Sequence, residues 1–502
     1  MASNVFLRKS SGLVKEAGLW DAVSINVANM SAGVALGAIG FTLSALPSVA
    51  GVNLVYASLI AFLLAVPQII VYTILSSLMP RTGGDYVWLS RALGPRLAWL
   101  VNGLVMAFII ESLAYYALVA IAGVYQLQSV LPLLGVNASF GPLAIAAIAV
   151  AFFAVPIAAN ILGTKHGLRL MTTLTTLSIA GLALALALML ATPRPAAETA
   201  AASLLPSGYS YGSVAGSYRG PGFLLANTLM VLPFFALFVY PWLNAGPAIG
   251  SEIRGKSAVK LNVLVAALLT MTLVTLGFAA MYRAFGFAFT TAALANPDVN
   301  SNVNFWTLAM ALAGDPALRW IIGITSVAWY LAVLAYGAIV IVRYWFALAF
   351  DRVWPSAFAY ISPRFKTPIY AHAFDFAVTA ALIAAASLLY NTFTALYGAL
   401  VGPLAYYALV GIAAVAIAAR RNGLGRGAKA LLAIAGVLQA AVFAYLEYLY
   451  VAYPQIWGGN WLAYGVEIGA FALGVAAYAV ARAVNLRKGI DISLAYVEIP
   501  PD

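Results

Sequence analysis

Two clusters of small residues interrupt long apolar runs, where each could expose backbone groups to a small charged molecule. They are residues 31–37 and 244–250, and both contain an Ala-Gly-x-Ala-x-Gly pattern. A membrane-spanning helix can leave its backbone unpaired only where that backbone is buried in protein or faces a polar cavity. The N–H end of a half-helix suits a carboxylate, and the carbonyl end suits an ammonium group. Paired interruptions predict a midplane binding site; the alternative is a small-residue face for close helix packing.

Glu111 is a second candidate, because it lies near the middle of an apolar run. That run has no basic residue, and Tyr115 follows one helical turn later. An ionised carboxylate is costly in this environment, so Glu111 could carry a proton during a transport cycle or face a cationic substrate. The alternative is a protonated Glu111 that bonds to a neighbouring helix and takes no part in transport, and both interpretations stay open.

Other reactive residue types are sparse, which argues against an enzyme. The chain has no Cys and only two His, and it contains neither an H-E-x-x-H motif nor a P-loop. We therefore expect no catalytic residue, no metal site and no cofactor. A channel is disfavoured because neither repeated pore loops nor charged rings are visible. A non-transporting membrane sensor stays an alternative, because sequence does not report turnover.

The composition places the chain in a membrane. Of its 502 residues, 64% are hydrophobic and 8% are charged, whereas soluble domains have about 25% charged residues. Apolar runs long enough to span a bilayer occur at 18–46, 52–79, 97–130, 141–162, 170–191, 222–250, 259–285, 317–346, 370–390, 393–419, 429–452 and 462–482. The sequence predicts an all-α integral membrane protein with 12 transmembrane helices, forming a single transporter domain over residues 1–502.

The distribution of basic residues orients these spans. With residues 1–17 in the cytoplasm, the cytoplasmic segments hold 22 of the 26 Lys and Arg residues. The positive-inside rule then places residues 483–502 in the cytoplasm as well. This placement accounts for the net charge of +11 without nucleic acid. We expect a multi-pass protein of the plasma membrane, surrounded by the lipid bilayer.

In this topology the two interrupted runs are spans 1 and 6, which cross the membrane in opposite directions. Residues 18–250 hold spans 1–6, residues 170–419 hold roughly spans 5–10, and residues 429–482 hold two additional spans. The order predicts a five-plus-five inverted repeat with broken helices 1 and 6, plus two C-terminal helices.

Three motifs give the chain a resemblance to a known family. They are Met-Ser-Ala-Gly-Val at 30–34, Pro-Arg-Thr-Gly-Gly-Asp-Tyr at 80–86 and Asp-Arg-Val-Trp-Pro at 351–355. With the number of spans, they make the chain resemble the amino acid permeases of the amino acid–polyamine–organocation (APC) superfamily over nearly its whole length. The resemblance implies a secondary active transporter that moves amino acids by alternating access. A polyamine or other organic-cation transporter of the same fold is the alternative.

The resemblance also implies the contacts with a small-molecule substrate. The amides of Ala32 and Gly33 would bind its α-carboxylate, and the carbonyls of Asn29 and those around Phe238 and Tyr240 would bind its α-amine. The expected substrate-binding residues are Asn29, Ser31, Ala32, Gly33, Phe238, Tyr240, Trp242 and Asn244, and the expected coupling or substrate-contacting residues are Glu111 and Tyr115. The chain departs from the family pattern at Ser31, where the family has Gly, and at Asn244, where it has an acidic residue.

Gating and coupling involve a different set of residues. Lys15, Glu252, Arg254 and Asp351 could form an inner gate of ion pairs, although such charges also act as topology signals. The middle of span 8, residues 331–335, has no hydroxyl that could bind sodium. We therefore expect proton coupling or exchange rather than sodium symport. The identity of the substrate, the stoichiometry, the direction of flux and the oligomeric state stay open.

Overall fold

A computed structural model describes residues 5–389, 402–420, 424–457 and 461–501 of the chain. Within this part, the regular elements are helices, and no β-strand occurs. Eleven of the helices are long and apolar enough to cross a membrane. The all-α membrane fold predicted from composition and apolar run length is therefore confirmed.

The long helices follow the predicted order of spans. They are α1 (Leu19–Asn29) with α2 (Ala32–Thr42), α3 (Leu54–Leu78), α5 (Ala98–Val130), α6 (Pro142–Ile161), α7 (Thr164–Ala191), α13 (Lys256–Phe285), α17 (Pro316–Phe350), α18 (Ile369–Ala384), α19 (Gly402–Arg420), α20 (Arg426–Ala452) and α22 (Trp461–Arg487). The predicted span at 222–250 is divided into short helices, which is why the described residues hold eleven long spans rather than twelve. Residues 393–401 of the predicted tenth span lie outside the described part of the chain.

The spans differ in how much protein surrounds them. In the first span, α1 with α2, 94% of the most apolar stretch is buried, and the value is 89% for both α5 and α17. It falls to 33% for α20 and 22% for α22. Exposed apolar faces on such helices suit contact with lipid. Helices α1, α2, α5 and α17 therefore form the interior in which a polar site must lie.

The first span is broken between Asn29 and Ala32. Ser31 has a φ of +52°, a left-handed conformation, which ends α1 because an L-residue in this conformation does not continue a right-handed helix. Helix α2 begins at the next residue. The break is thus shorter than the small-residue cluster at 31–37, most of which belongs to α2.

The sixth span is broken more widely, and earlier than the sequence pattern suggested. It consists of α10 (Leu225–Leu229), α11 (Leu232–Phe238), non-helical residues 239–244, α12 (Ala245–Ala248) and the 3-10 helix η4 (Gly250–Glu252). Pro241 lies in the non-helical segment and has no N–H group with which to continue α11. Pro247 lies in the first turn of α12, where proline is tolerated. The cluster at 244–250 therefore lies mostly after the break, because the second half-helix begins at Ala245.

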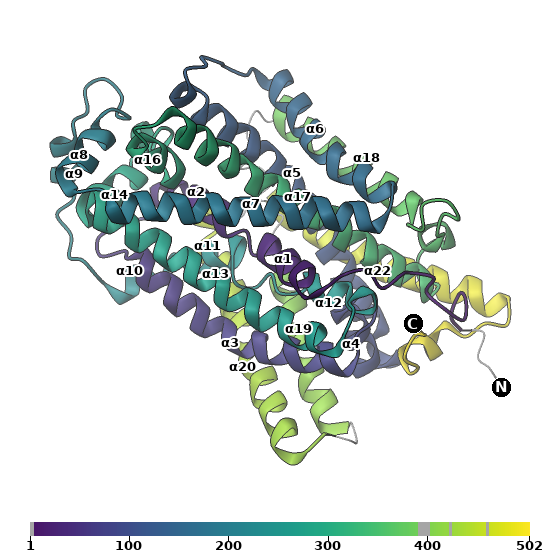
Figure 1. The fold of residues 1–502 in the computed structure, drawn as a ribbon. Helices are drawn as coiled ribbons and strands as arrows, with labels where there is room; N and C mark the ends of the chain where they lie inside the picture. Colours follow the sequence, from purple (N-terminus) through teal and green to yellow (C-terminus); the bar gives the residue numbers. More distant parts are fainter. Residues whose placement is uncertain (1–4, 390–401, 421–423, 458–460, 502) are drawn as a thin grey trace.

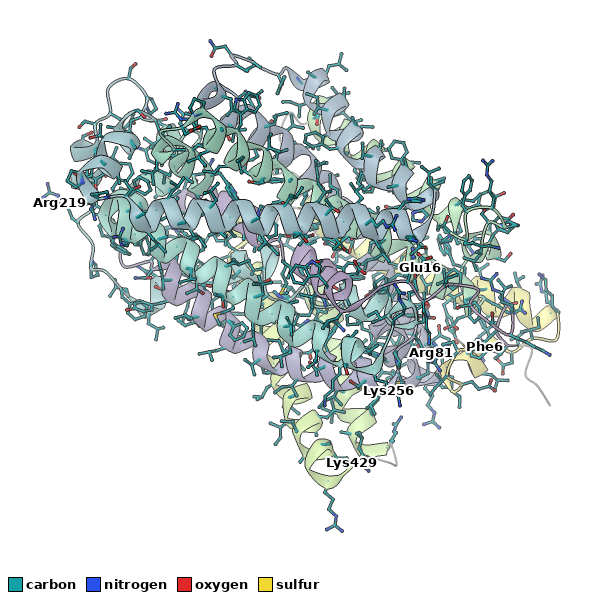
Figure 2. All side chains as sticks on the ribbon, viewed as in Figure 1. Phe6, Glu16, Arg81, Arg219, Lys256 and Lys429 are labelled. Carbon is teal, nitrogen blue, oxygen red and sulfur yellow. The ribbon has the colours of Figure 1, made fainter. Side chains whose placement is uncertain are left out.

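Figure 1 shows short helices at two opposite ends of the helix bundle. Helices α8 (Arg194–Ala202), α9 (Tyr211–Ser217) and α14 (Phe287–Ala295) lie at one end, and α4 (Asp85–Leu93) and α12 lie at the other. In Figure 2, Arg81 and Lys256 lie toward the end with α4, and Arg219 lies toward the opposite end. We call the end that contains α4 and α12 the basic end.

Candidate functional site

The two helix breaks lie against each other and are joined by asparagine side chains. Asn29, the last residue of α1, donates from Nδ2 to Oδ1 of Asn244 at 3.0 Å. Nearly one turn earlier in α1, Oδ1 of Asn26 accepts the backbone N–H of Gly246 at 2.8 Å. Both asparagines of α1 are buried. The end of α1 is therefore held against the start of α12 by two side-chain hydrogen bonds.

The break in the first span presents backbone groups of opposite polarity. Helix α2 starts at Ala32, so the N–H groups of its first turn have no acceptor within the helix. The carbonyl of Asn29 accepts the Ser31 hydroxyl at 3.1 Å. That hydroxyl also lies 3.0 Å from Oη of Tyr115 on α5. Ser31 therefore occupies, through its hydroxyl, a carbonyl that could otherwise accept a hydrogen bond from an ammonium group. The same hydroxyl links the break to α5.

Two tryptophans enclose Gly33. A Cβ atom on Gly33 would lie 2.1 Å from Cδ1 of Trp329 on α17, and Nε1 of Trp306 donates to the Gly33 carbonyl at 2.9 Å. The ring of Trp329 therefore fills the space beside the start of α2. The Nε1 atom of Trp329 is buried without a hydrogen-bond partner among the described residues. This region therefore contains an N–H donor that none of those residues accepts.

Three aromatic side chains connect Ser31 to Asn244. The ring of Trp242 stacks on Tyr115, with centroids 5.4 Å apart and 9° between the planes. Tyr407 of α19 meets Trp242 edge to face at 6.1 Å, and its hydroxyl donates to Oδ1 of Asn244 at 3.0 Å. The three rings form apolar walls. The hydroxyl of Tyr115 bonds to Ser31 at the first break, and that of Tyr407 bonds to Asn244 at the second.

Tyr240 is placed differently from Trp242. Its Oη lies 2.7 Å from Oγ of Ser58 on α3, and its ring packs against Phe62 of the same helix at 5.6 Å. Phe238 is 1% exposed at the end of α11. The Tyr240 side chain therefore contacts α3 and not the breaks. The expected substrate residues that lie at the breaks are Asn29, Ser31, Ala32, Gly33, Trp242 and Asn244.

Glu111 and Tyr115 lie on the same helix but contact different neighbours. Glu111 is 0% exposed, and a Cβ atom on Gly402 of α19 would lie 2.5 Å from its Oε2. No hydrogen bond of the described residues joins Glu111 to either break, whereas Tyr115 reaches Ser31 directly. The structure brings Tyr115 to the breaks and places Glu111 against α19.

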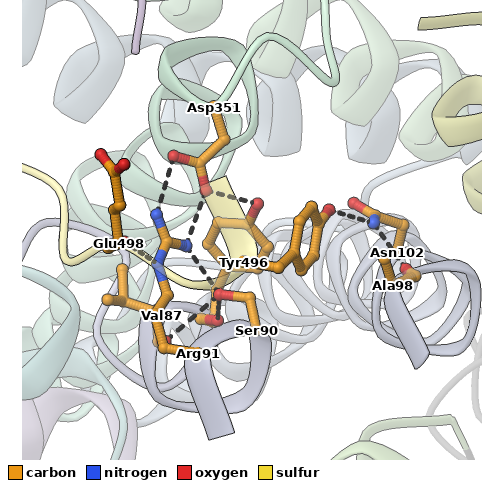
Figure 3. Close-up of polar contacts among 9 residues, drawn as sticks. Val87, Ser90, Arg91, Ala98, Asn102, Asp351, Tyr496 and Glu498 are labelled. Atoms are coloured by element: carbon orange, nitrogen blue, oxygen red, sulfur yellow. Dashed lines mark hydrogen bonds and ion pairs between the residues drawn. The ribbon is translucent and has the colours of Figure 1, made fainter. Parts of the chain in front are cut away.

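Two buried ion pairs hold the basic end together. Arg343 of α17 donates from Nε and Nη2 to the two carboxylate oxygens of Glu252, at 2.9 and 2.7 Å. Both side chains are 1% exposed. Arg91 of α4 binds Asp351 in the same two-point manner, at 2.7 and 3.0 Å (Figure 3). Such two-point pairs fix geometry as well as charge.

The partners in these pairs differ from those that the sequence suggested. Glu252 and Asp351 are paired, but with arginines that lie 91 and 260 residues away in sequence. Arg254 instead donates to the backbone carbonyl of Glu16 at 2.6 Å, and Lys15 is exposed. Sequence spacing cannot identify contacts of this range, because they form only once α4, α17 and η4 have packed.

Asp85, the first residue of α4, is a buried carboxylate that sequence reasoning did not single out as a site residue. It accepts hydrogen bonds from the hydroxyls of Tyr72 at 2.6 Å, Tyr344 at 2.5 Å and Tyr406 at 2.8 Å. Burial raises the pKa of Asp85 to about 6, although the tyrosine hydrogen bonds act in the opposite direction. The signal that could have revealed it was an acidic residue directly after two glycines in the 80–86 motif.

Those two glycines determine how Asp85 is placed. Gly83 and Gly84 have φ values of +86° and +41°, which favour glycine over residues with a Cβ. A Cβ atom on Gly84 would also lie 2.7 Å from the carbonyl carbon of Pro247. The loop that leads into α4 therefore packs its backbone directly on the second half of the broken sixth span.

Comparison with known proteins agrees with this architecture. Residues 18–472 match a protein family described as amino acid permease. A search of curated proteins finds no match to the chain. The matched region includes both helix breaks and both buried ion pairs.

Proposed function

The chain belongs to the amino acid permease family, and we propose that it is a secondary active transporter that moves amino acids across the plasma membrane by alternating access. In this proposal, transport is coupled to protons or to exchange rather than to sodium. The observation that carries it is the pair of helix breaks joined through Asn29 and Asn244, because facing half-helix ends bind small charged substrates in transporters.

The substrate carboxylate is proposed to bind the N–H groups of Ala32 and Gly33. Each charge at a helix end contributes about 0.3–1 kcal/mol when exposed and up to about 2 kcal/mol when partly buried. The substrate ammonium would take over the Asn29 carbonyl, which now accepts the Ser31 hydroxyl at 3.1 Å. Ser31 would then keep its contact with Tyr115.

Entry of a substrate requires space that Trp329 now fills. Its Cδ1 lies too close to Gly33 to leave room for a Cβ atom, so in this proposal the indole turns away before a carboxylate reaches the start of α2. The Nε1 atom of Trp329 has no hydrogen-bond partner among the described residues. The indole can therefore move without breaking a hydrogen bond to any of those residues. We therefore propose that Trp329 acts as the lid over the carboxylate end of the site.

Release at the basic end requires the two buried ion pairs to separate. Arg343–Glu252 joins α17 to η4, and Arg91–Asp351 joins α4 to the end of α17. Both pairs lie at the end that the distribution of basic residues assigns to the cytoplasm. We propose that they form the inner gate.

The hydroxyls of span 8 support a coupling ion other than sodium. Thr325 donates to the carbonyl of Ile321 at 2.7 Å, within its own helix. Ser326 donates to Gly323 at 2.7 Å and accepts from Gln126 at 3.2 Å. These oxygens already have protein partners, so they are poorly suited to replace the hydration shell of an ion.

A ligand screen on the purified protein tests the proposal. Its thermal unfolding is measured with single amino acids, polyamines and nucleobases, each with and without sodium. A ligand at about 100 times its Kd stabilises the folded state by about 2.7 kcal/mol. We expect at least one amino acid to raise the Tm, and sodium to add nothing. A rise with polyamines alone would favour an organic-cation transporter, and binding without uptake into liposomes would favour a sensor.

A further inference from the structure

A continuous chain of hydrogen bonds joins the two helix breaks to Asp85. Asn29 donates to Asn244 at 3.0 Å, Asn244 donates from Nδ2 to Oη of Tyr344 at 2.9 Å, and Tyr344 donates to Asp85 at 2.5 Å. All four side chains are buried. Because hydrogen bonds in a low-dielectric interior polarise one another, the charge of Asp85 acts on both breaks through this chain.

The surroundings of Asp85 are rich in hydroxyls. Its hydrogen-bond donors come from α3, α17 and α19, three separate spans. The other charged and titratable groups around α4 bond elsewhere: Tyr86 and Arg91 to Asp351, Tyr407 to Asn244, Tyr496 to Asn102 and Arg420 to the Ala92 carbonyl. In the described part of the chain Asp85 has no cationic partner, so its ionised form is only partly compensated for the loss of water.

A cavity at the basic end reaches Tyr86, the residue that follows this carboxylate. Its lining includes Arg81 and Thr82 of the loop before α4, Tyr86 of α4, Ser251 of η4 and Asp351 of the gate. The hydroxyl oxygens of Thr82 and Ser251, two of the lining residues, lie 2.5 Å apart and join the loop to η4. Separation of η4 from this loop would admit water to the residues next to Asp85.

We propose that Asp85 is the proton-binding site of the transporter, and that its protonated form favours closure of the basic end. This inference rests on the proposed transport function. Glu111, the candidate from the sequence, lacks a hydrogen-bonded connection to the breaks among the described residues, whereas Asp85 is three hydrogen bonds from Asn29. Asp85 also lies where the loop packs on the second half of span 6.

The direction of the effect follows from proton linkage. In the closed structure burial raises the pKa of Asp85 to about 6, and hydration in an open state would return it toward about 3.9. The proton binds more tightly to the state with the higher pKa, so acid favours the closed state and loss of the proton favours opening. Opening toward a neutral cytoplasm therefore releases the proton on that side.

A cysteine reporter can follow this opening without a known substrate, because the chain contains no native Cys. Ser251→Cys is introduced into the full-length protein in liposomes, and its rate of reaction with a membrane-impermeant maleimide is divided by that of Ser10→Cys, an exposed position of the N-terminal segment. We expect this ratio to rise several-fold between about pH 5 and about pH 8, with a midpoint near the Asp85 pKa. With Asp85→Asn the ratio should stay at its low, acid value at every pH. The same rise in Asp85→Asn would overturn the proposal.

Two conservative variants test the site even if Asp85→Asn does not fold. Tyr344→Phe and Tyr406→Phe each remove one hydroxyl that stabilises the ionised carboxylate. Both should therefore move the midpoint of the reporter to higher pH. A reporter midpoint that does not move in either tyrosine variant contradicts the assignment of the proton site to Asp85. So does a pH dependence that disappears in Glu111→Gln and persists in Asp85→Asn. Asp298→Asn, at an exposed position at the opposite end, is the matched control and should leave the profile unchanged.

Uptake measurements on the same liposomes separate this inference from the proposed function. The probe is a mixture of the radiolabelled proteinogenic amino acids. Uptake whose pH dependence is the same in wild type and Asp85→Asn would refute the proton site and keep the transporter. A reporter profile as expected, without uptake of any amino acid, would keep the proton site and refute amino acid transport.

Discussion

Gly33 shows how one small residue can serve both packing and binding. Its missing side chain makes room for the Trp329 ring, and its own N–H group together with that of Ala32 is the proposed carboxylate site. We predict that Gly33→Ala lowers the Tm of the substrate-free protein and strongly reduces uptake, because a Cβ atom would lie 2.1 Å from Trp329. Overpacking of this kind costs about 1–3 kcal/mol.

The control for Gly33→Ala is Gly469→Ala, where an added Cβ would have no neighbour within 4 Å. That variant should keep the wild-type Tm or exceed it slightly, since Ala favours helix over Gly. Adding Trp329→Leu to Gly33→Ala should restore part of the Tm but not the uptake. If Gly33→Ala is as stable and as active as wild type, the close packing at the break is not as described.

Ser31 carries the backbone strain that ends α1. Its φ of +52° is unfavourable for residues with a Cβ, and most of all for β-branched ones. We predict that Ser31→Val lowers the stability by about 2 kcal/mol or more, whereas Ser31→Gly is nearly neutral, because relief of strain offsets the lost hydrogen bond to Tyr115. Thermal unfolding of the two purified variants measures the difference, and equal Tm values would mean that the break does not depend on this conformation.

At the scale of elements, the basic end depends on contacts between α4, α17 and η4. Glu252→Gln would leave Arg343 as a buried cation with a neutral partner, and breaking a buried pair typically costs about 3–5 kcal/mol. We predict that this variant opens the basic end, so that the Ser251→Cys reporter reacts faster at acid pH.

The matched control for that change is Glu198→Gln. Its pair with Arg194 is exposed, with side-chain exposures of 38% and 47%, and exposed pairs contribute about 0–1 kcal/mol. It should leave both the Tm and the reporter unchanged. An equal effect of the two substitutions would show that the buried pair does not hold the end closed.

The elements also show what a sequence pattern can and cannot locate. Small residues and prolines identified the two interrupted spans, because helix propensity and missing N–H groups are local properties. The positions of the breaks were less accurate: the first is confined to residues 30–31, and the second precedes residue 245. Pro247 suggested a break but starts a half-helix, since proline is tolerated in a first turn.

At the scale of the whole molecule, the fold was largely predictable because membrane spans are long and apolar in sequence. The candidate site was less predictable from the sequence. The contact between Ser31 and Tyr115 joins two residues that the sequence suggested as site residues, but Asp85 is surrounded by tyrosines of α3, α17 and α19 that lie up to 321 residues away. No local pattern reports such a convergence.

The orientation of the whole bundle follows from the distribution of its basic residues and can be tested separately. We predict that, in intact cells, an impermeant maleimide labels Ser203→Cys, an exposed position on the loop of α8 at the end opposite the basic end. Ser10→Cys should react only after the membrane is permeabilised. The reverse pattern would place the basic end outside.

The central claim is that the half-helix end at Ala32 and Gly33 binds the carboxylate of a free amino acid. The most direct measurement compares the Tm shift produced by the best-binding amino acid with that of its α-carboxamide, which keeps the side chain and the ammonium group. We predict that the acid stabilises the protein and that the amide loses most of this effect, because the helix end then meets no negative charge. Equal stabilisation by acid and amide would contradict the account.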